Sequence, residues 1–234
     1  MRIHKFIAES GYCSRRAAED LIREGKVLVN KKPAVIGQEI DPEKDCVYCE
    51  GHRLRLKVAN KRYFIFYKPR GVITAMKAQD DRSVVADLIG GIKGRVYPIG
   101  RLDRDSEGLL LLTDDGEAAQ KLTHPAQQVE KVYHLWVSGF TPGAERRLER
   151  PIVLDGRPIC PPGVRLLHQS GGTAMLEITI HEGRNRQIRR MCQSAGLTVT
   201  RLKRIREGRL SLGGLEPGCW RLLTAQEQEY LNSL

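Results

Sequence analysis

The sequence contains no apolar stretch long enough to cross a lipid bilayer. Its first residues, Met1 to Lys5, lack the apolar core of a secretory signal peptide, so we expect a cytoplasmic protein. Internal repeats and low-complexity tracts are also missing. With 234 residues, of which 41% are hydrophobic, the chain can form one large domain or a small domain followed by a larger one.

Acidic residues are scarce relative to basic ones. The chain has 28 Asp and Glu against 39 Lys and Arg, which gives a formal charge of +11. Such an excess indicates a polyanionic partner. Because no segment suits a membrane, the charge favours nucleic acid.

A convincing metal or cofactor motif is lacking as well. Six cysteines are present, and in a cytoplasmic chain we expect free thiols. Cys46, Cys49 and His52 have a spacing that suggests zinc, but no second pair follows at zinc-ribbon distance. Residues 46 to 49 also alternate like a strand. Without a glycine-rich phosphate loop, we expect neither metal nor cofactor.

The most informative segment is a charged loop, residues 100 to 108, that leads into the apolar run Leu109 to Leu112. The run predicts a buried strand, and the bracketing glycines permit sharp turns. A carboxylate on this loop, Asp103 beside Arg101, is suited to act as a nucleophile or general base. The charge pattern by itself favours a plain surface turn.

The first 50 residues have a character of their own. Ile3, Phe6 and Ile7 share one helical face, and Ser14 is a candidate N-cap for a second helix. Residues 27 to 29 predict a strand, followed by a turn at 30 to 33. Cations gather along this segment, at Arg15, Arg16, Arg23, Lys26, Lys31 and Lys32. They form either a solvated surface or, as we favour, a face that contacts phosphates.

Strands and helices alternate through the rest of the chain. The pattern predicts strands at 63–67, 132–137 and 175–180, helices at 117–122, 144–150 and 186–194, a short helix capped by Ser83, and a hairpin turn at Asp155-Gly156. We therefore expect an α+β protein with a mixed, mainly antiparallel sheet flanked by helices.

Four arginines crowd residues 184 to 190. Gly183 is expected to turn the backbone just before this helix, whose N-terminus favours anions. Ile188 and Met191 anchor one side of the helix, which could aim Arg189 inward. A buried arginine needs an acidic partner, and the residue pattern does not identify one.

Several of these segments resemble a known family. Residues 100–103, 106–110 and 113–116 are similar to the signature of bacterial ribosomal RNA pseudouridine synthases, and Lys68-Pro69-Arg70-Gly71 and Lys131-Val132-Tyr133 match further motifs. Residues 14–19 and 25–30 resemble a small RNA-binding domain first known from a ribosomal protein. Lys31 stands where that domain often has Gly, and Glu207 where the synthases often have Ile.

The resemblance implies isomerisation of uridine to pseudouridine in ribosomal RNA, without cofactor or metal. By this resemblance, Asp103 is the essential catalytic residue, Tyr133 stacks on the target base and assists proton removal from it, and Arg189 pairs with Asp103. Asp103 either attacks the nucleotide covalently or removes a sugar proton. The implied domains are residues 1–58, for RNA binding, and 59–234, for catalysis.

The expected partner is ribosomal RNA or a pre-ribosomal particle, bound by a monomer. The form of residues 182 to 191 favours large-subunit RNA over small-subunit RNA. A non-catalytic ribosome-assembly factor and a helix–turn–helix DNA regulator are the alternatives. The residues expected to contact RNA are Lys5, Arg15, Arg16, Arg23, Lys26, Lys31, Lys32, Arg101, Arg184, Arg186, Arg190 and Arg204.

Overall fold

The chain forms two compact units, Met1–Lys61 and Arg62–Leu234. The structure is a computed structural model that describes residues 1–56, 61–78, 80–124 and 127–233. The boundary predicted between residues 58 and 59 lies outside these ranges. Within them, no helix is both long enough and apolar enough to cross a membrane.

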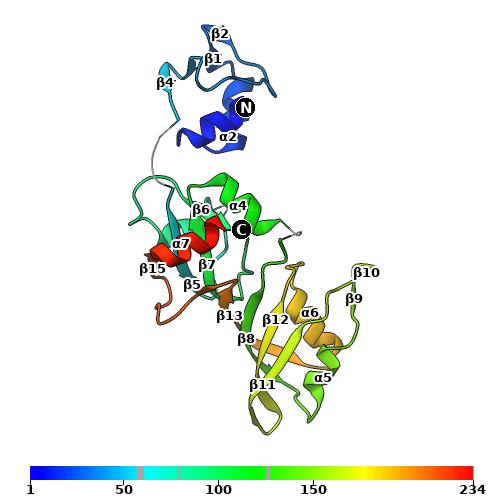
Figure 1. Cartoon of the computed structure of the whole chain (residues 1–234). Coiled ribbons are helices and arrows are strands. Elements are labelled where there is room, and N and C mark those ends of the chain that lie inside the picture. Colours follow the sequence, from blue (N-terminus) through cyan, green and yellow to red (C-terminus); the bar gives the residue numbers. More distant parts are fainter. Residues whose placement is uncertain (57–60, 79, 125–126, 234) are drawn as a thin grey trace. The chain divides into compact units, whose positions relative to one another are not determined.

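The N-terminal unit packs two helices against a four-stranded antiparallel sheet (Figure 1). Ser14 caps the second helix as predicted, since its hydroxyl accepts a hydrogen bond from the Ala17 amide at 3.0 Å. The elements are α1 (Ile3–Glu9), α2 (Arg15–Arg23), β1 (Val27–Val29), β2 (Lys32–Pro33), β3 (Val47–Cys49) and β4 (His52–Leu54).

A two-residue turn joins β1 to β2. Asn30 and Lys31 both have left-handed backbones, with φ of 50° and 67°. Such turns match the twist of the flanking strands but strongly favour Gly at the second position. Lys31 thus forms the same turn that a Gly would form. Its left-handed backbone conformation costs a lysine conformational free energy.

The segment with zinc-like spacing is a strand, the second of the two interpretations. Residues Val47–Cys49 form β3, and Cys49 pairs with His52 across the β3–β4 ladder. All six cysteines are free thiols. In the described part of the chain no group of His, Cys, Asp or Glu could hold a metal ion.

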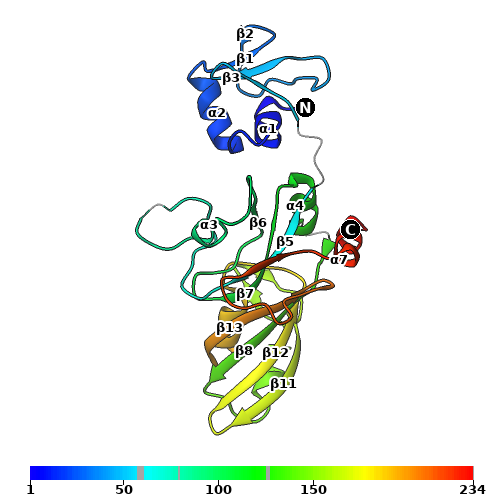
Figure 2. The same ribbon diagram turned by 90° about the vertical axis from the view of Figure 1, so that its left-hand side faces the viewer.

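The C-terminal unit is built on a nine-stranded sheet whose central path runs β11-β12-β8-β13-β7-β5-β15, with β14 beside β13 and β6 beside β7 (Figures 1 and 2). Pairing is antiparallel except between β13 and β7, which run parallel. The expected mixed, mainly antiparallel sheet is therefore confirmed. The strands are β5 (Tyr63–Lys68), β6 (Tyr97–Ile99), β7 (Glu107–Thr113), β8 (Lys131–Ser138), β11 (Gly163–Ser170), β12 (Thr173–Ile180), β13 (Thr198–Glu207), β14 (Leu210–Ser211) and β15 (Trp220–Leu222).

Helices cover both faces of the centre of this sheet. One core joins Leu110 and Leu112 to residues of α3, α5 and α6, and the other joins Leu109 and Leu111 to residues of α4 and α7. Strand β7 is consequently buried along its whole length, which explains its unbroken apolar sequence. The helices are α3 (Val85–Leu88), α4 (Gly116–Thr123), α5 (Ala144–Leu148), α6 (Gln187–Ser194) and α7 (Ala225–Asn232).

Most predicted elements are present, with local corrections. The hairpin at Asp155-Gly156 joins β9 (Val153–Leu154) to β10 (Arg157–Pro158). The cap of α3 is Val84 and not Ser83, because the Asp87 side chain accepts from the Val84 amide. At α6 the left-handed residue is Arg186, with φ of 49°, and not Gly183.

The backbones of β7 and β13 approach each other closely at Gly108. A Cβ atom there would lie 2.2 Å from the Arg204 carbonyl oxygen, and the backbone φ is 107°. Gly108→Ala should therefore lower the free energy of unfolding of this unit by about 3 kcal/mol, from backbone strain and the clash. Denaturant titration followed by tryptophan fluorescence measures it, since Trp136 and Trp220 both belong to this unit.

Gly90→Ala is the matched control, because no atom lies within 4 Å of a Cβ built there. It should change stability by no more than about 1 kcal/mol. Equal effects of the two substitutions would contradict the close approach at Gly108.

Candidate active site

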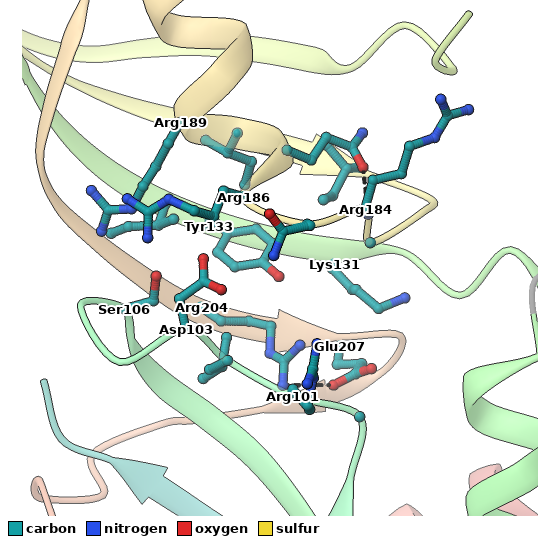
Figure 3. A pocket seen from close by; sticks show the side chains of 18 of the residues that line it. Arg101, Asp103, Ser106, Lys131, Tyr133, Arg184, Arg186, Arg189, Arg204 and Glu207 are labelled. Carbon is teal, nitrogen blue, oxygen red and sulfur yellow. Dashed lines mark hydrogen bonds and ion pairs between the residues drawn. The ribbon is translucent and has the colours of Figure 1, made fainter. Parts of the chain in front are cut away.

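A cavity of about 370 Å³ opens at the centre of the large sheet, where the parallel strands meet. Its walls come from the loop before β7, from β8, from α6 and the segment before it, and from the end of β13. Asp103, Tyr133 and Arg189, the three residues predicted for catalysis, all line it (Figure 3). Asp103 and Tyr133 are 30 positions apart in the sequence, and Tyr133 and Arg189 are 56 positions apart. The fold thus brings all three to one site.

The loop that carries Asp103 is held by its backbone. Thr74 binds both the amide and the carbonyl of Leu102, at 3.2 and 2.7 Å. The Arg104 carbonyl accepts from the Gly71 amide at 2.7 Å, and the Asp103 carbonyl accepts from the Ser106 amide at 3.1 Å. The loop is therefore fixed on both sides of Asp103.

Lys68 braces the same loop through hydrogen bonds, a role that the sequence motif did not reveal. Its side chain is fully buried, and its ammonium donates to the carbonyls of Pro69 and Ser106 at 2.9 and 2.7 Å. Burial lowers the pKa of Lys68 to about 8, although the nearby carboxylates of Asp103, Asp105 and Glu107 oppose the shift.

The Asp103 carboxylate, in contrast, makes no hydrogen bond or ion pair with any described residue. It points into the cavity towards Tyr133 (Figure 3). Tyr133 is buried, and burial is the main cause that raises its pKa, against the opposing charge of Arg204. An anchored backbone with an unoccupied carboxylate facing an aromatic side chain can receive a planar base and act on the attached sugar.

The predicted partner of Arg189 was wrong. Its guanidinium lies 3.2 Å from the Asp105 carboxylate, and it also donates to the Asp105 carbonyl at 2.9 Å and to the Val199 carbonyl at 3.2 Å. Arg189 is directed inward as expected, with 12% of its side chain exposed. It therefore fixes the loop two residues beyond Asp103 and leaves the Asp103 carboxylate open.

Arg186 completes this ion-pair network. Its two terminal nitrogens each donate to one oxygen of Asp105 at 3.1 Å. Burial acts to raise the pKa of Asp105, but the hydrogen bond from Arg186 and the charges of Arg189 and Arg186 outweigh burial and hold the pKa below its usual value. Asp105 is thus an ionised anchor between the loop and α6.

Other cations predicted to contact RNA have partners within the protein. Arg184 donates to the carbonyls of Leu154, Arg157 and Pro158, and Arg190 forms a bidentate pair with Asp155. Arg204 is 3% exposed and lines the cavity, so its predicted contact with RNA would have to be made inside the cavity. Arg101 is exposed at the cavity rim, and no described residue pairs with it.

In the N-terminal unit the predicted basic face divides in the same way. Lys5 pairs with Glu9, Arg23 with Glu19 and Asp20, and Lys26 with Glu24 and Glu50. A second group is exposed and has no partner among the described residues; it consists of Arg15, Arg16, Lys31 and Lys32. Within the predicted basic face, these four cations have charge available to an anion.

Comparison with known families agrees with the division of the chain into an N-terminal and a C-terminal unit. Residues 62–194 match the family described as RNA pseudouridylate synthase, and residues 1–45 match the S4 domain. The first match spans the cavity walls from the Asp103 loop to α6.

Relatives match over the whole length. Ribosomal large subunit pseudouridine synthase B of Bacillus subtilis is 44% identical over 100% of this chain and 96% of its own. The protein of that name from Vibrio cholerae is 37% identical over 100% of this chain and 74% of its own. A crystal structure of a pseudouridylate synthase, 30% identical, superposes with a TM-score of 0.69 over 99% of both chains.

The family match covers more than half of the chain, so the DNA-regulator alternative is not favoured. The comparisons account for both parts of the chain. The first part is the S4 domain, and the second carries the cavity formed by the Asp103 loop, Tyr133 and the inward Arg189. The chain belongs to the RNA pseudouridylate synthase family.

Proposed function

We propose that this enzyme converts a uridine of large-subunit ribosomal RNA to pseudouridine, with Asp103 as the reacting carboxylate. The observation that carries the proposal is the Asp103 side chain, which faces the cavity without a protein partner although its backbone is fixed on both sides. Similarity over nearly the whole of a large-subunit synthase supports the choice of RNA.

The geometry supports a division of roles. The target base must leave its stack to reach Asp103, and the Tyr133 ring can receive it in the cavity. The carboxylate of Asp103 then acts on the sugar, by covalent attack or by removal of a proton. Arg189 acts as a positioning residue, because its contacts with Asp105 fix the loop.

Two further proposals concern the setting of the reaction. We infer a cytoplasmic location from the proposed substrate. We also propose that it acts as a monomer. Mapping pseudouridines in ribosomal RNA from a strain that lacks the gene would identify the substrate, since one site in large-subunit RNA should stay unmodified. A missing site in small-subunit RNA would overturn that choice.

Asp103→Asn should abolish pseudouridine formation and leave stability within about 0.5 kcal/mol of the original. The change removes the nucleophile or base but no hydrogen bond within the described structure. Tritium release from RNA labelled at uridine C5 measures activity, and denaturant titration measures stability. Substantial turnover by the folded variant would disprove the role of Asp103.

Arg189→Ala should reduce the single-turnover rate at saturating RNA by about 100-fold, because small displacements of a reacting group have effects of this size. The dissociation constant for RNA should change little. Asp105→Asn should produce a similar loss, and the double variant should be hardly worse than either single one, since both remove the same contact. A change confined to RNA affinity would show that Arg189 is a phosphate contact.

Neutralising the four unpartnered cations of the S4 domain should weaken RNA binding and its salt dependence. The variant combines Arg15→Gln, Arg16→Gln, Lys31→Asn and Lys32→Gln, with Asn chosen because it tolerates the left-handed backbone at position 31. Each lost phosphate contact should reduce the slope of log affinity against log salt by about 0.7 to 0.9.

Arg23→Gln combined with Lys26→Gln is the matched control. These two cations already pair with acids, so their loss should change the slope less, per charge removed, than the loss of the unpartnered group. Equal slopes for the four-residue variant and the original protein would place this face in solvent and not on RNA.

A further inference from the structure

Glu207 places a buried carboxylate in the cavity, and the proposed roles do not use it. Its residue is 4% exposed, and it lines the cavity with Asp103 and Tyr133. Its Oε2 lies 3.3 Å from Nη2 of Arg204, yet neither of these two atoms has a hydrogen-bond partner. A buried ion pair that keeps unused hydrogen-bonding capacity is costly unless another molecule uses it.

A β-bulge directs Glu207 into the cavity. On β13, Arg204 is opposite Tyr133 and Glu207 is opposite Lys131, with a shift in register between Arg204 and Arg206. In a regular strand, side chains three positions apart point to opposite faces. The bulge changes this alternation, so Arg204 and Glu207 both face the cavity (Figure 3).

Two cations accompany the carboxylate. Arg204 uses Nε to bind the Leu109 carbonyl at 2.7 Å, and its Nη2 is left without a hydrogen bond. Lys131 donates to the Val129 carbonyl at 3.0 Å, which uses one of its three N–H groups. The cavity therefore offers one strong acceptor together with donors from two side chains.

This set complements one edge of uracil. The edge presents an acceptor at O2, a donor at N3–H and a second acceptor at O4. Cytosine presents an acceptor at N3, which a carboxylate would repel. We propose, on the basis of the function proposed above, that Glu207 accepts a hydrogen bond from N3–H of the target uracil. Arg204 and Lys131 then donate to the carbonyl oxygens of the uracil.

The chemistry of the reaction suits such a contact. The bond from C1′ to N1 breaks and a bond from C1′ to C5 forms, while C5 loses a proton and N1 gains one. Turning the ring about the axis through N3 and C6 exchanges N1 with C5 and O2 with O4. It leaves N3–H in place, so the same three side chains can hold the ring before and after it turns.

The test uses two synthetic RNAs that contain the mapped uridine, identical except for a methyl group on its N3. Single-turnover rates at saturating RNA are measured by nuclease digestion and mass spectrometry. The original enzyme should react at least about 100-fold more slowly with the methylated RNA, since a site built for a donor rejects an analogue that lacks it. Glu207→Ile should reduce this ratio to less than about tenfold.

Glu207→Gln keeps an acceptor without the charge. It should preserve rejection of the methylated RNA but react about tenfold more slowly with the unmodified one. Glu130→Gln is the matched control, because Glu130 is exposed, pairs with Arg206 and does not line the cavity. It should behave like the original enzyme with both RNAs.

An unchanged ratio in folded Glu207→Ile would overturn the proposal. If that variant does not fold, as judged by tryptophan fluorescence, Glu207→Gln decides, and the original rate on unmodified RNA would then overturn it. An original enzyme that is inactive on the unmodified RNA would instead refute the proposed function.

Discussion

The architecture of the C-terminal unit depends on the close parallel contact between β7 and β13. Gly108 sits against the Arg204 backbone with no room for a side chain. The contact brings the start of β7, and with it the Asp103 loop, beside the strand that carries Arg204 and Glu207. The cavity walls that come from the Asp103 loop, β8, α6 and β13 are placed by this pair of strands or by elements packed against it.

Charge in the site is organised so that the Asp103 carboxylate stays available. Asp105 forms ion pairs with Arg186 and Arg189, and Lys68 donates hydrogen bonds to two backbone carbonyls. Asp103 makes no such contact with any described residue. Ion pairs in a partly buried site are strong enough to fix geometry, because they are only weakly screened. Rigidity therefore comes from the neighbours of Asp103, and its own oxygens are left for the substrate.

The sequence alone predicted much of this arrangement. Apolar periodicity and turn residues located β5, β7, β8, β12 and most helices, and the resemblance named Asp103, Tyr133 and Arg189, which the fold brings to one cavity. The partner of Arg189 could not be predicted, because Asp103 and Asp105 lie two residues apart on a loop whose conformation depends on distant contacts.

The contribution of β13 was also beyond sequence reasoning. Its charged residues alternate with apolar ones, but the bulge that turns Glu207 inward leaves no signature in the pattern. Residue type likewise did not separate the cations with acid partners from Arg15 and Arg16, which have none among the described residues.

The position of β13 in the sheet has a consequence for how the protein folds. Strands β11 and β12 can pair soon after they form, since only Gly171 and Gly172 separate them, whereas β13 must insert between β8 and a strand nearly a hundred residues earlier. Closing such long loops is slow because chain entropy is lost before contacts compensate it. We therefore expect the cavity to assemble late in folding, so that a partly folded chain would hold Asp103 without the strand that completes its site.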